Sequence, residues 1–261
     1  MLKRRLIPCL FLKNGLIVRS ESFTDFRELG NPIDQLKRLN DWNADEVIYV
    51  DITRSGEHDL KRDDLKVKRK SDIVDILQEI AKTSFMPLTF GGRIVNLFQV
   101  DTFIRNGADK IIINSGAYRN PGLISEVAGK YGSQAIVVGL DVKAERGRHV
   151  MYIDNGRTRV EDDPIKYAKK VEASGAGEIF LNSIDRDGKA NGFDCISIQK
   201  IVQAVSIPVI ACGGAGTFED FVEVYEKTDV AAAAAGNIFN FTENAYVRAK
   251  KKLKERGASV R

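Results

Sequence analysis

The sequence predicts a single (β/α)8 TIM barrel, an α/β fold that typically takes about 250 residues. Three observations lead to this prediction: the chain has 261 residues, short apolar runs alternate with amphipathic helical patterns, and the second half repeats landmarks of the first. Near-continuous apolar strands indicate burial on both faces, as in a parallel sheet. We expect one barrel domain over residues 1–261, built from two (βα)4 half-barrels at about 1–130 and 131–261.

Eight apolar runs are the predicted strands. Each is short, and each is separated from the next by a stretch long enough for a helix, which is typical of repeated βα units. In chain order they are RLIPCL (5–10), EVIYVDI (46–52), MPLTF (86–90), KIIIN (110–114), AIVVGLD (135–141), EIFLNS (178–183), IPVIAC (207–212) and VAAAAA (230–235).

Helix-start signals separate these strands. Asn31 is a predicted N-cap, with Pro32 at the first helical position, where a missing N–H costs nothing. Ser71, Asn120 and Thr217 are predicted to open three further helices by the same logic. The four amphipathic segments are 31–43, 71–82, 120–132 and 217–227.

An internal repeat relates the two halves at an offset of roughly 120 to 130 residues. CLFLKNG (9–15) matches GLDVKAERG (139–147), except that Phe11 stands against Asp141. TFGGRI (89–94) corresponds to ACGGAG (211–216) in the same way. Two halves of one barrel explain these matches better than two separate domains, because four parallel strands make no closed core.

Composition excludes several classes of function. The net charge of +4 suits anionic small molecules and is too weak to predict nucleic-acid binding. No run approaches the roughly 18 apolar residues of a membrane helix, and the first apolar run is too short for a signal peptide. Three widely spaced cysteines give neither a disulfide framework nor a zinc site. We expect a cytoplasmic protein with no cofactor, no metal and no membrane or nucleic-acid partner.

Active sites of such barrels lie at the C-terminal ends of the strands. Two glycine pairs end strands there, Gly91-Gly92 and Gly213-Gly214, and glycine lets backbone N–H groups approach an anion closely. One such pair is more often a tight turn, but two pairs at equivalent places favour a ligand with a phosphate at each end. The small polar turns one strand later complete the prediction: Asn114-Ser115 and Gly236-Asn237.

Charged residues at or after the same strand ends are further candidates. Asp141 and Asp187 are carboxylates that can act as general acid or base, although capping or loop stabilisation is the alternative role. Lys13 and Arg19 follow the first strand and can bind an anionic substrate.

Four charges lie at the opposite ends of the strands. Arg5, Glu46, Lys110 and Glu178 begin the first, second, fourth and sixth strands, and their alternating signs predict a salt-bridged ring. Ordinary surface ion pairing is the alternative. A charged insert at residues 59–70 breaks the symmetry of the halves, and it is either a solvated loop or a docking surface for a partner.

Together these motifs resemble the cyclase subunit (HisF) family of imidazole glycerol phosphate synthase, over nearly the whole chain. The related isomerase of histidine biosynthesis shares the half-barrel repeat, but it lacks the SIDRDG run and the charged ring. The segments that carry the resemblance are DEVIYVDIT (45–53), GADKIIINSGA (107–117), GSQAIVVGLDVK (132–143), SIDRDGKANGFD (183–194) and ACGGAG (211–216).

The resemblance implies a lyase-type cyclase that forms a heterodimeric glutamine amidotransferase complex. A glutaminase subunit docks on the bottom of the barrel, and its ammonia passes an ammonia gate that matches Arg5, Glu46, Lys110 and Glu178. At the top, ammonia attacks a bis-phosphorylated ribulosyl aminoimidazole carboxamide nucleotide, which yields imidazole glycerol phosphate and an aminoimidazole carboxamide ribotide.

The same resemblance implies roles at the top of the barrel. Asp141 matches one of the two catalytic aspartates of the family, and Asp187 lies in the matching substrate loop. The two glycine pairs, with the polar turns after them, match its two phosphate sites.

The chain departs from the family pattern mainly at its reaction end. Phe11 stands where the family has its other catalytic aspartate, and a phenyl ring has no proton to give. Loss of a general acid typically costs about 10²–10⁴-fold in rate. The other departures are Arg93 for a glycine, Arg19 for a lysine, Asn182 for a threonine and Asn237 for a serine.

These departures leave a second function open. A divergent paralogue with weakened or absent cyclase activity would channel ammonia from a glutaminase to a third protein, a sugar amidotransferase of surface polysaccharide (lipopolysaccharide) synthesis. A plain phosphosugar-binding barrel, the third alternative, does not explain the charged ring.

Overall fold

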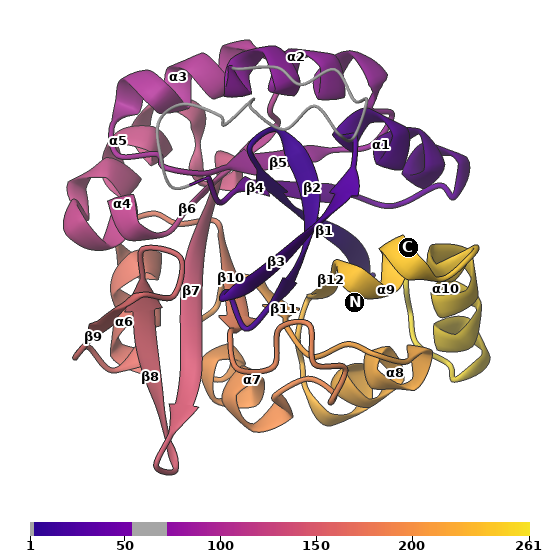
Figure 1. The fold of residues 1–261 in the computed structure, drawn as a ribbon. Coiled ribbons are helices and arrows are strands. Elements are labelled where there is room, and N and C mark those ends of the chain that lie inside the picture. The colour runs from indigo at the N-terminus through magenta and orange to yellow at the C-terminus, as the bar shows by residue number, and fades with distance from the viewer. Residues whose placement is uncertain (1–2, 54–71) are drawn as a thin grey trace.

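Parallel hydrogen bonding closes a ring of eight strands in the computed structural model of the chain, which describes residues 3–53 and 72–261. The strands follow one another around the ring in chain order, β12 pairs back to β1, and β7 pairs directly with β10. This confirms the predicted barrel, which Figure 1 shows along its axis. The eight strands are β1 (Arg5–Lys13), β4 (Val47–Asp51), β5 (Leu88–Gly91), β6 (Lys110–Ile113), β7 (Ile136–Glu145), β10 (Glu178–Ser183), β11 (Val209–Cys212) and β12 (Ala232–Ala235).

Helices surround the strands, and the order of elements in the first half recurs in the second (Figure 1). In each half a short helix begins just after the tip of the last strand, and a longer helix follows it. The helices are α1 (Pro32–Asp41), α2 (Ile73–Thr83), α3 (Leu97–Arg105), α4 (Ser115–Arg119), α5 (Gly122–Tyr131), α6 (Pro164–Ala173), α7 (Cys195–Val202), α8 (Phe218–Lys227), α9 (Asn237–Phe241) and α10 (Ala245–Glu255), with a 3-10 turn at Ser133–Ala135.

Two of the predicted helix caps are confirmed. The Asn31 side chain accepts a hydrogen bond from the Ile33 N–H, and Thr217 forms a capping box with α8. The prediction for Asn120 was wrong, because α5 begins one residue later than that cap requires and Asn120 instead ends α4.

The cap of α2 also differs from the prediction. Its N-cap is Asp72, whose side chain accepts from the Val74 N–H. Ser71 and the charged insert at residues 59–70 lie outside the described residues.

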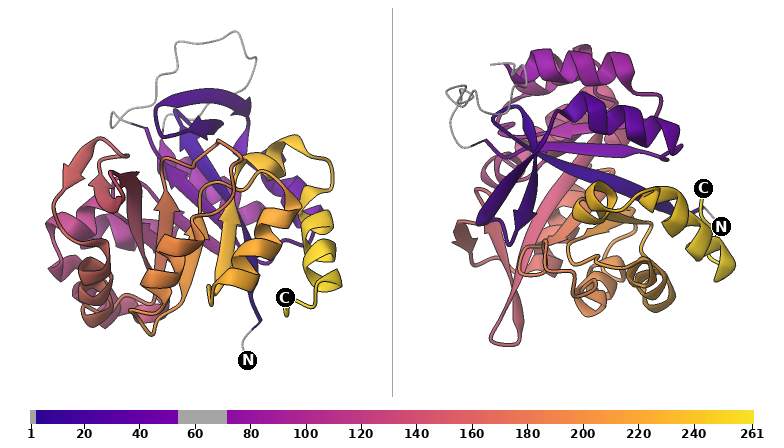
Figure 2. Two further views of the ribbon diagram at one scale, coloured as in Figure 1. Left: turned by 90° about the horizontal axis from the view of Figure 1, so that it is seen from below. Right: turned by 45° about the vertical axis from the view of Figure 1, so that its right-hand side comes forward.

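Two antiparallel hairpins, which the strand pattern did not predict, rise from β1 and β7. They are formed by β2 (Leu16–Glu21) with β3 (Asp25–Gly30), and by β8 (Arg148–Ile153) with β9 (Thr158–Val160). The turns that start them, Asn14-Gly15 and Arg146-Gly147, have positive φ at both residues, as tight hairpin turns require. Figure 2 shows the β2–β3 hairpin at one end of the barrel and both chain termini toward the other.

The interior of the barrel is apolar between its two ends. Inward side chains of β1 alternate with outward ones, so that Ile7, Cys9 and Phe11 belong to one buried cluster with Phe180 of β10. A second cluster lies between the strands and the helices. Among the described residues, no helix is both long and apolar enough to cross a bilayer.

Candidate active site

The four charges predicted at the strand starts form a closed ring, called here the N-terminal ring. Arg5 contacts the Glu46 and Glu178 carboxylates at 2.7 Å each, through Nη1 and Nη2 respectively. Lys110 Nζ contacts the same two carboxylates at 3.1 and 2.6 Å. The predicted salt-bridged ring is therefore present at the bottom of the barrel.

Burial makes this ring different from a surface ion pair. Glu46 is 2% exposed and also accepts a hydrogen bond from Thr89 Oγ1. Burial alone would raise the pKa of Glu178, but hydrogen bonds and charge from Arg5 and Lys110 outweigh it, so the pKa lies below its ordinary value. Each carboxylate contacts two cations, and removal of either cation would leave buried charge unpaired.

Two cavities open at the opposite end of the barrel, at the C-terminal ends of the strands. Cavity 1, of about 330 Å³, lies over β11, β12 and β1, and cavity 2, of about 260 Å³, lies over β5, β6 and β7. Phe11 lines both. The two cavities therefore meet at the tip of β1, near the barrel axis.

Cavity 1 contains the second glycine pair. Gly213 and Gly214 have φ of +96° and +105°, and a Cβ at either would lie within 2.5 Å of a backbone oxygen. Only glycine fits this bend, which exposes backbone to the cavity. Arg19 and Asn237 line the same cavity, and Asn237 Nδ2 also donates to the Ser20 carbonyl at 3.2 Å, which ties the hairpin to the cavity rim.

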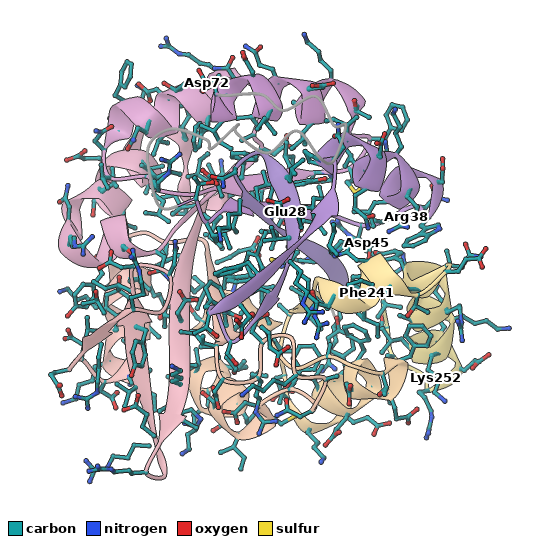
Figure 3. All side chains as sticks on the ribbon, in the orientation of Figure 1. Glu28, Arg38, Asp45, Asp72, Phe241 and Lys252 are labelled. Carbon is teal, nitrogen blue, oxygen red and sulfur yellow. The ribbon has the colours of Figure 1, made fainter. Side chains whose placement is uncertain are left out.

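A cation and an aromatic ring border this cavity on its outer side. The guanidinium carbon of Arg19 lies 6.0 Å from the centre of the Phe241 ring, which is labelled on α9 in Figure 3. Phe241 is 60% exposed. Arg19 also contacts Glu21 at 3.2 Å, so the charge that would face a bound anion is already partly shared.

Cavity 2 contains the first glycine pair together with an arginine. Gly92 has φ of +130°, and a Cβ there would lie 2.4 Å from the Asp51 carbonyl oxygen. Arg93 has φ of +55°, and its Nη2 contacts buried Asp51 Oδ2 at 3.0 Å. Ser115 lines the cavity and accepts a hydrogen bond from the Asp154 N–H at 2.8 Å. The side chain that departs from the family pattern thus places a guanidinium beside the glycine turn.

Asp141, on β7, is a second buried carboxylate of cavity 2, in addition to Asp51. Its two oxygens accept hydrogen bonds from Asn182 Nδ2 at 3.0 Å and from Asn114 Nδ2 at 2.9 Å. Burial raises its pKa to about 6, although the two amide hydrogen bonds act in the opposite direction. A carboxyl with this pKa is mostly ionised at neutral pH and can accept a proton.

Asp187 is the buried carboxylate of cavity 1. Ser20 Oγ donates to its Oδ2 at 2.6 Å. Burial raises its pKa to about 7, against the hydrogen bonds from Ser20 and the Phe23 N–H, and the nearby charge of Asp141 raises it further. At neutral pH this carboxyl is therefore divided between its acid and base forms, a condition suited to proton transfer.

The half of the site around Phe11 is apolar. Its ring makes an edge-on contact with Phe23, at 5.1 Å between centres. In the sheet Phe11 pairs with Val50, whereas its counterpart Asp141 pairs with Asn182. Where β7 and β10 present a carboxylate and an amide, β1 and β4 present a phenyl ring and an isopropyl group.

The structure brings most of the predicted top-face residues together, in two groups. Among the described residues that line the two cavities, Lys13 and Gly91 are absent. The Lys13 ammonium lies over the Phe26 ring instead, at 4.7 Å from its centre. Cavity 1 takes Arg19, Asp187, Gly213, Gly214, Gly236 and Asn237; cavity 2 takes Gly92, Asn114, Ser115 and Asp141; Phe11 belongs to both.

Sequence reasoning missed the contacts that the hairpins make with the site. Ser20 and Phe23 belong to the β2–β3 hairpin and its turn, which the strand pattern did not reveal. The Asn14-Gly15 dipeptide was the available signal, because it is typical of a two-residue hairpin turn. Asn182 was noted only as a departure from the family, and its bond to Asp141 follows from the register of β7 and β10.

The chain is similar to known proteins along its whole length. A family model described as "Histidine biosynthesis protein" matches residues 5–245. Imidazole glycerol phosphate synthase subunit HisF of Bacillus cereus is 40% identical, over the full length of both chains. The proteins of the same name from Hydrogenobaculum sp. and Alkaliphilus metalliredigens are 40% and 37% identical, again over the full length of both chains.

Proposed function

The chain belongs to the histidine biosynthesis protein family, and from that premise we propose that it is the cyclase subunit of an imidazole glycerol phosphate synthase. It would use ammonia from a glutaminase subunit to convert the bis-phosphorylated ribulosyl aminoimidazole carboxamide nucleotide into imidazole glycerol phosphate and the aminoimidazole carboxamide ribotide. The proposal assigns the top of the barrel to the nucleotide and the bottom to ammonia entry.

One observation carries the proposal: two glycine-lined cavities meet at Phe11, and each contains a buried carboxyl. A long molecule with an anionic group at each end fits this arrangement, with its middle over the barrel axis. Backbone N–H groups at the glycine turns, together with Arg19 and Arg93, supply the positive potential that phosphates require.

The two carboxyls suit the proton transfers of an ammonia-dependent cyclisation. Asp141, with a pKa of about 6, would take a proton from the attacking nitrogen. Asp187, with a pKa of about 7, would return a proton to a departing oxygen. Because Phe11 offers no proton, the site has one carboxyl fewer for these proton transfers than the family pattern.

The N-terminal ring supports the assignment of the bottom of the barrel. Above the ring the interior is lined by apolar side chains, including Ile7, Ile48 and Phe180. A neutral molecule such as ammonia loses little on entering such surroundings, whereas an ion loses most of its hydration energy. A glutaminase docked below would therefore deliver ammonia through the barrel toward buried Asp141.

The direct test is turnover by the purified chain with ammonium chloride and the bis-phosphorylated nucleotide. We expect imidazole glycerol phosphate to form, at a rate about 10²–10⁴-fold below the 1–10³ per second usual for enzymes, because one acid is missing. Asp141→Asn should abolish the remaining rate, while Asn155→Ala, in the same cavity, should keep it.

The ammonia-channelling scaffold of polysaccharide synthesis stays the alternative prediction. The apolar pair of Phe11 and Val50 is the feature that favours it. Absence of turnover in the wild type, with turnover in Phe11→Asp, would favour the scaffold. Absence in both would exclude the cyclase reaction for this site.

A further inference from the structure

Asn182 contains a buried oxygen atom whose hydrogen bond is missing. The residue is fully buried at the tip of β10, and its Nδ2 donates to Asp141 Oδ1 at 3.0 Å. Its Oδ1 has no hydrogen-bond partner among the described residues. A buried polar atom left in this state costs about 1–3 kcal/mol. The fold therefore maintains an unused acceptor beside the candidate catalytic carboxyl.

The orientation of this amide follows from charge. If the Asn182 amide were turned over, its carbonyl oxygen would face a carboxylate oxygen of Asp141 with no proton between them. The second Asp141 oxygen cannot relieve that contact, because it already accepts from Asn114 Nδ2 at 2.9 Å. The amide thus commits its N–H groups to Asp141, and its oxygen is available only as an acceptor.

Within residues 3–53 and 72–261, no donor lies within hydrogen-bond distance of this oxygen. Asn182 lines cavity 2 together with the apolar side chains Phe11, Val50 and Phe180. It also lies on the inward face of β10, two residues beyond Phe180 and four beyond Glu178 of the N-terminal ring. The oxygen therefore lies where the interior of the barrel meets the cavity.

We infer that the side-chain oxygen of Asn182 accepts a hydrogen bond from an N–H group of a reacting molecule, which makes Asn182 a positioning residue beside Asp141. This inference rests on the proposed function, which brings nitrogen to this point from two sources. One source is ammonia that rises through the barrel; the other is an amino or carboxamide group of the nucleotide. Both present an N–H donor, and two binding experiments separate them.

The first experiment tests whether ammonia is the donor, and it measures binding without turnover. The protein is labelled with ¹³C at its aspartate carboxyl groups and titrated with methylammonium chloride, with potassium chloride as the control for ionic strength. If ammonia is the donor, the Asp141 signal shifts in the wild type, and Asn182→Leu weakens the apparent affinity about 5–10-fold, the value of one hydrogen bond of about 1–1.4 kcal/mol.

The second experiment tests whether an N–H group of the nucleotide is the donor. Calorimetric titration with the bis-phosphorylated nucleotide, in the absence of ammonia, compares the wild type with Asn182→Leu. If an N–H of the nucleotide is the donor, the affinity falls by the same 5–10-fold. The matched control in both experiments is Asn155→Ala, because Asn155 lines cavity 2 but donates to the Ile52 carbonyl at 3.2 Å.

A loss in either experiment, absent from Asn155→Ala, supports the inference and names the donor. Affinities of Asn182→Leu within twofold of the wild type in both experiments overturn it. Urea unfolding checks that the variant is folded; if it is not, Asn182→Ser carries the same comparison, because its short hydroxyl cannot reach the place of Oδ1. Since neither experiment needs turnover, a wild type that binds but does not react contradicts the proposed function alone.

Discussion

Phe11 and Asp141 occupy equivalent positions in the two halves of the barrel, and their neighbours on the next parallel strand differ in the same sense. Phe11 pairs with Val50 and Asp141 pairs with Asn182. The third member of the polar group, Asn114, lies between β6 and α4, where the other half has Gly236 between β12 and α9. The replacement at position 11 is therefore part of an apolar environment and is not an isolated change.

Phe11→Asp should raise the rate of ammonia-dependent cyclisation about 10²–10⁴-fold, because it supplies a second carboxyl at the meeting point of the cavities. It should also lower the free energy of unfolding by about 1–3 kcal/mol, because the ring contact with Phe23 is lost and a carboxyl enters apolar surroundings. Steady-state assays and urea unfolding measure the two effects. Phe11→Asn is the control: similar stability loss without a rate increase is expected, and an equal rate increase would contradict the proton-donor role.

The free energy of unfolding should fall as pH rises from about 4 to about 7. Asp187 has a folded pKa of about 7, above its ordinary value of 3.8, so the unfolded chain releases this proton first. The stabilisation is complete below the unfolded pKa and is lost as pH approaches the folded pKa, at about 1.4 kcal/mol for each unit between them. Urea unfolding across this range should show a shallower decline in Asp187→Asn. An unchanged slope in that variant would show that Asp187 titrates normally.

Arg5→Ala should lower the free energy of unfolding by about 3–5 kcal/mol, because Glu46 and Glu178 would keep only Lys110 as a cation. The matched control is Lys227→Ala, which removes an exposed pair with Glu223 and should cost less than about 1 kcal/mol. Urea unfolding at constant pH compares them. Similar losses in both variants would mean that burial adds nothing to the ring.

Phe85→Ala should weaken the proposed glutaminase complex about tenfold or more while leaving the stability of the chain unchanged. Phe85 is 89% exposed in the loop before β5, at the same end of the barrel as the N-terminal ring. Large exposed aromatic side chains often dominate binding energy at an interface. Phe98→Ala is the control, because Phe98 is 77% exposed at the opposite end, in the first turn of α3. Surface plasmon resonance measures both, and equal effects would exclude docking at the ring end.

The fold could be predicted from the sequence because its signals are local and repeated. Apolar runs gave the strands to within a few residues, and the repeat of Gly91-Gly92 in Gly213-Gly214 placed them in one barrel. The ring followed from strand starts alone, since parallel strands of a barrel begin at the same end. The strands, the repeat and the ring all follow from the spacing of residues along the chain, which can be seen in the sequence itself.

The chemistry of the site could be predicted only in part, because it depends on contacts between distant elements. The raised pKa of Asp187 comes from its burial, against the hydrogen bond from the hairpin residue Ser20, and the pairing of Arg93 with Asp51 needs the geometry of two strand ends. The unused oxygen of Asn182 depends on which atom faces Asp141. No spacing rule reports such orientations.

The N-terminal ring contains two positive and two negative side chains, so its formal charge is zero. The field of alternating charges falls off much faster with distance than that of a single charge. Accordingly, burial and two amides account for the pKa of Asp141, with no contribution from the ring. The charges at the two ends of this barrel therefore act separately. Substitutions at the top can alter the chemistry of the site while leaving the ion pairs of the N-terminal ring unchanged.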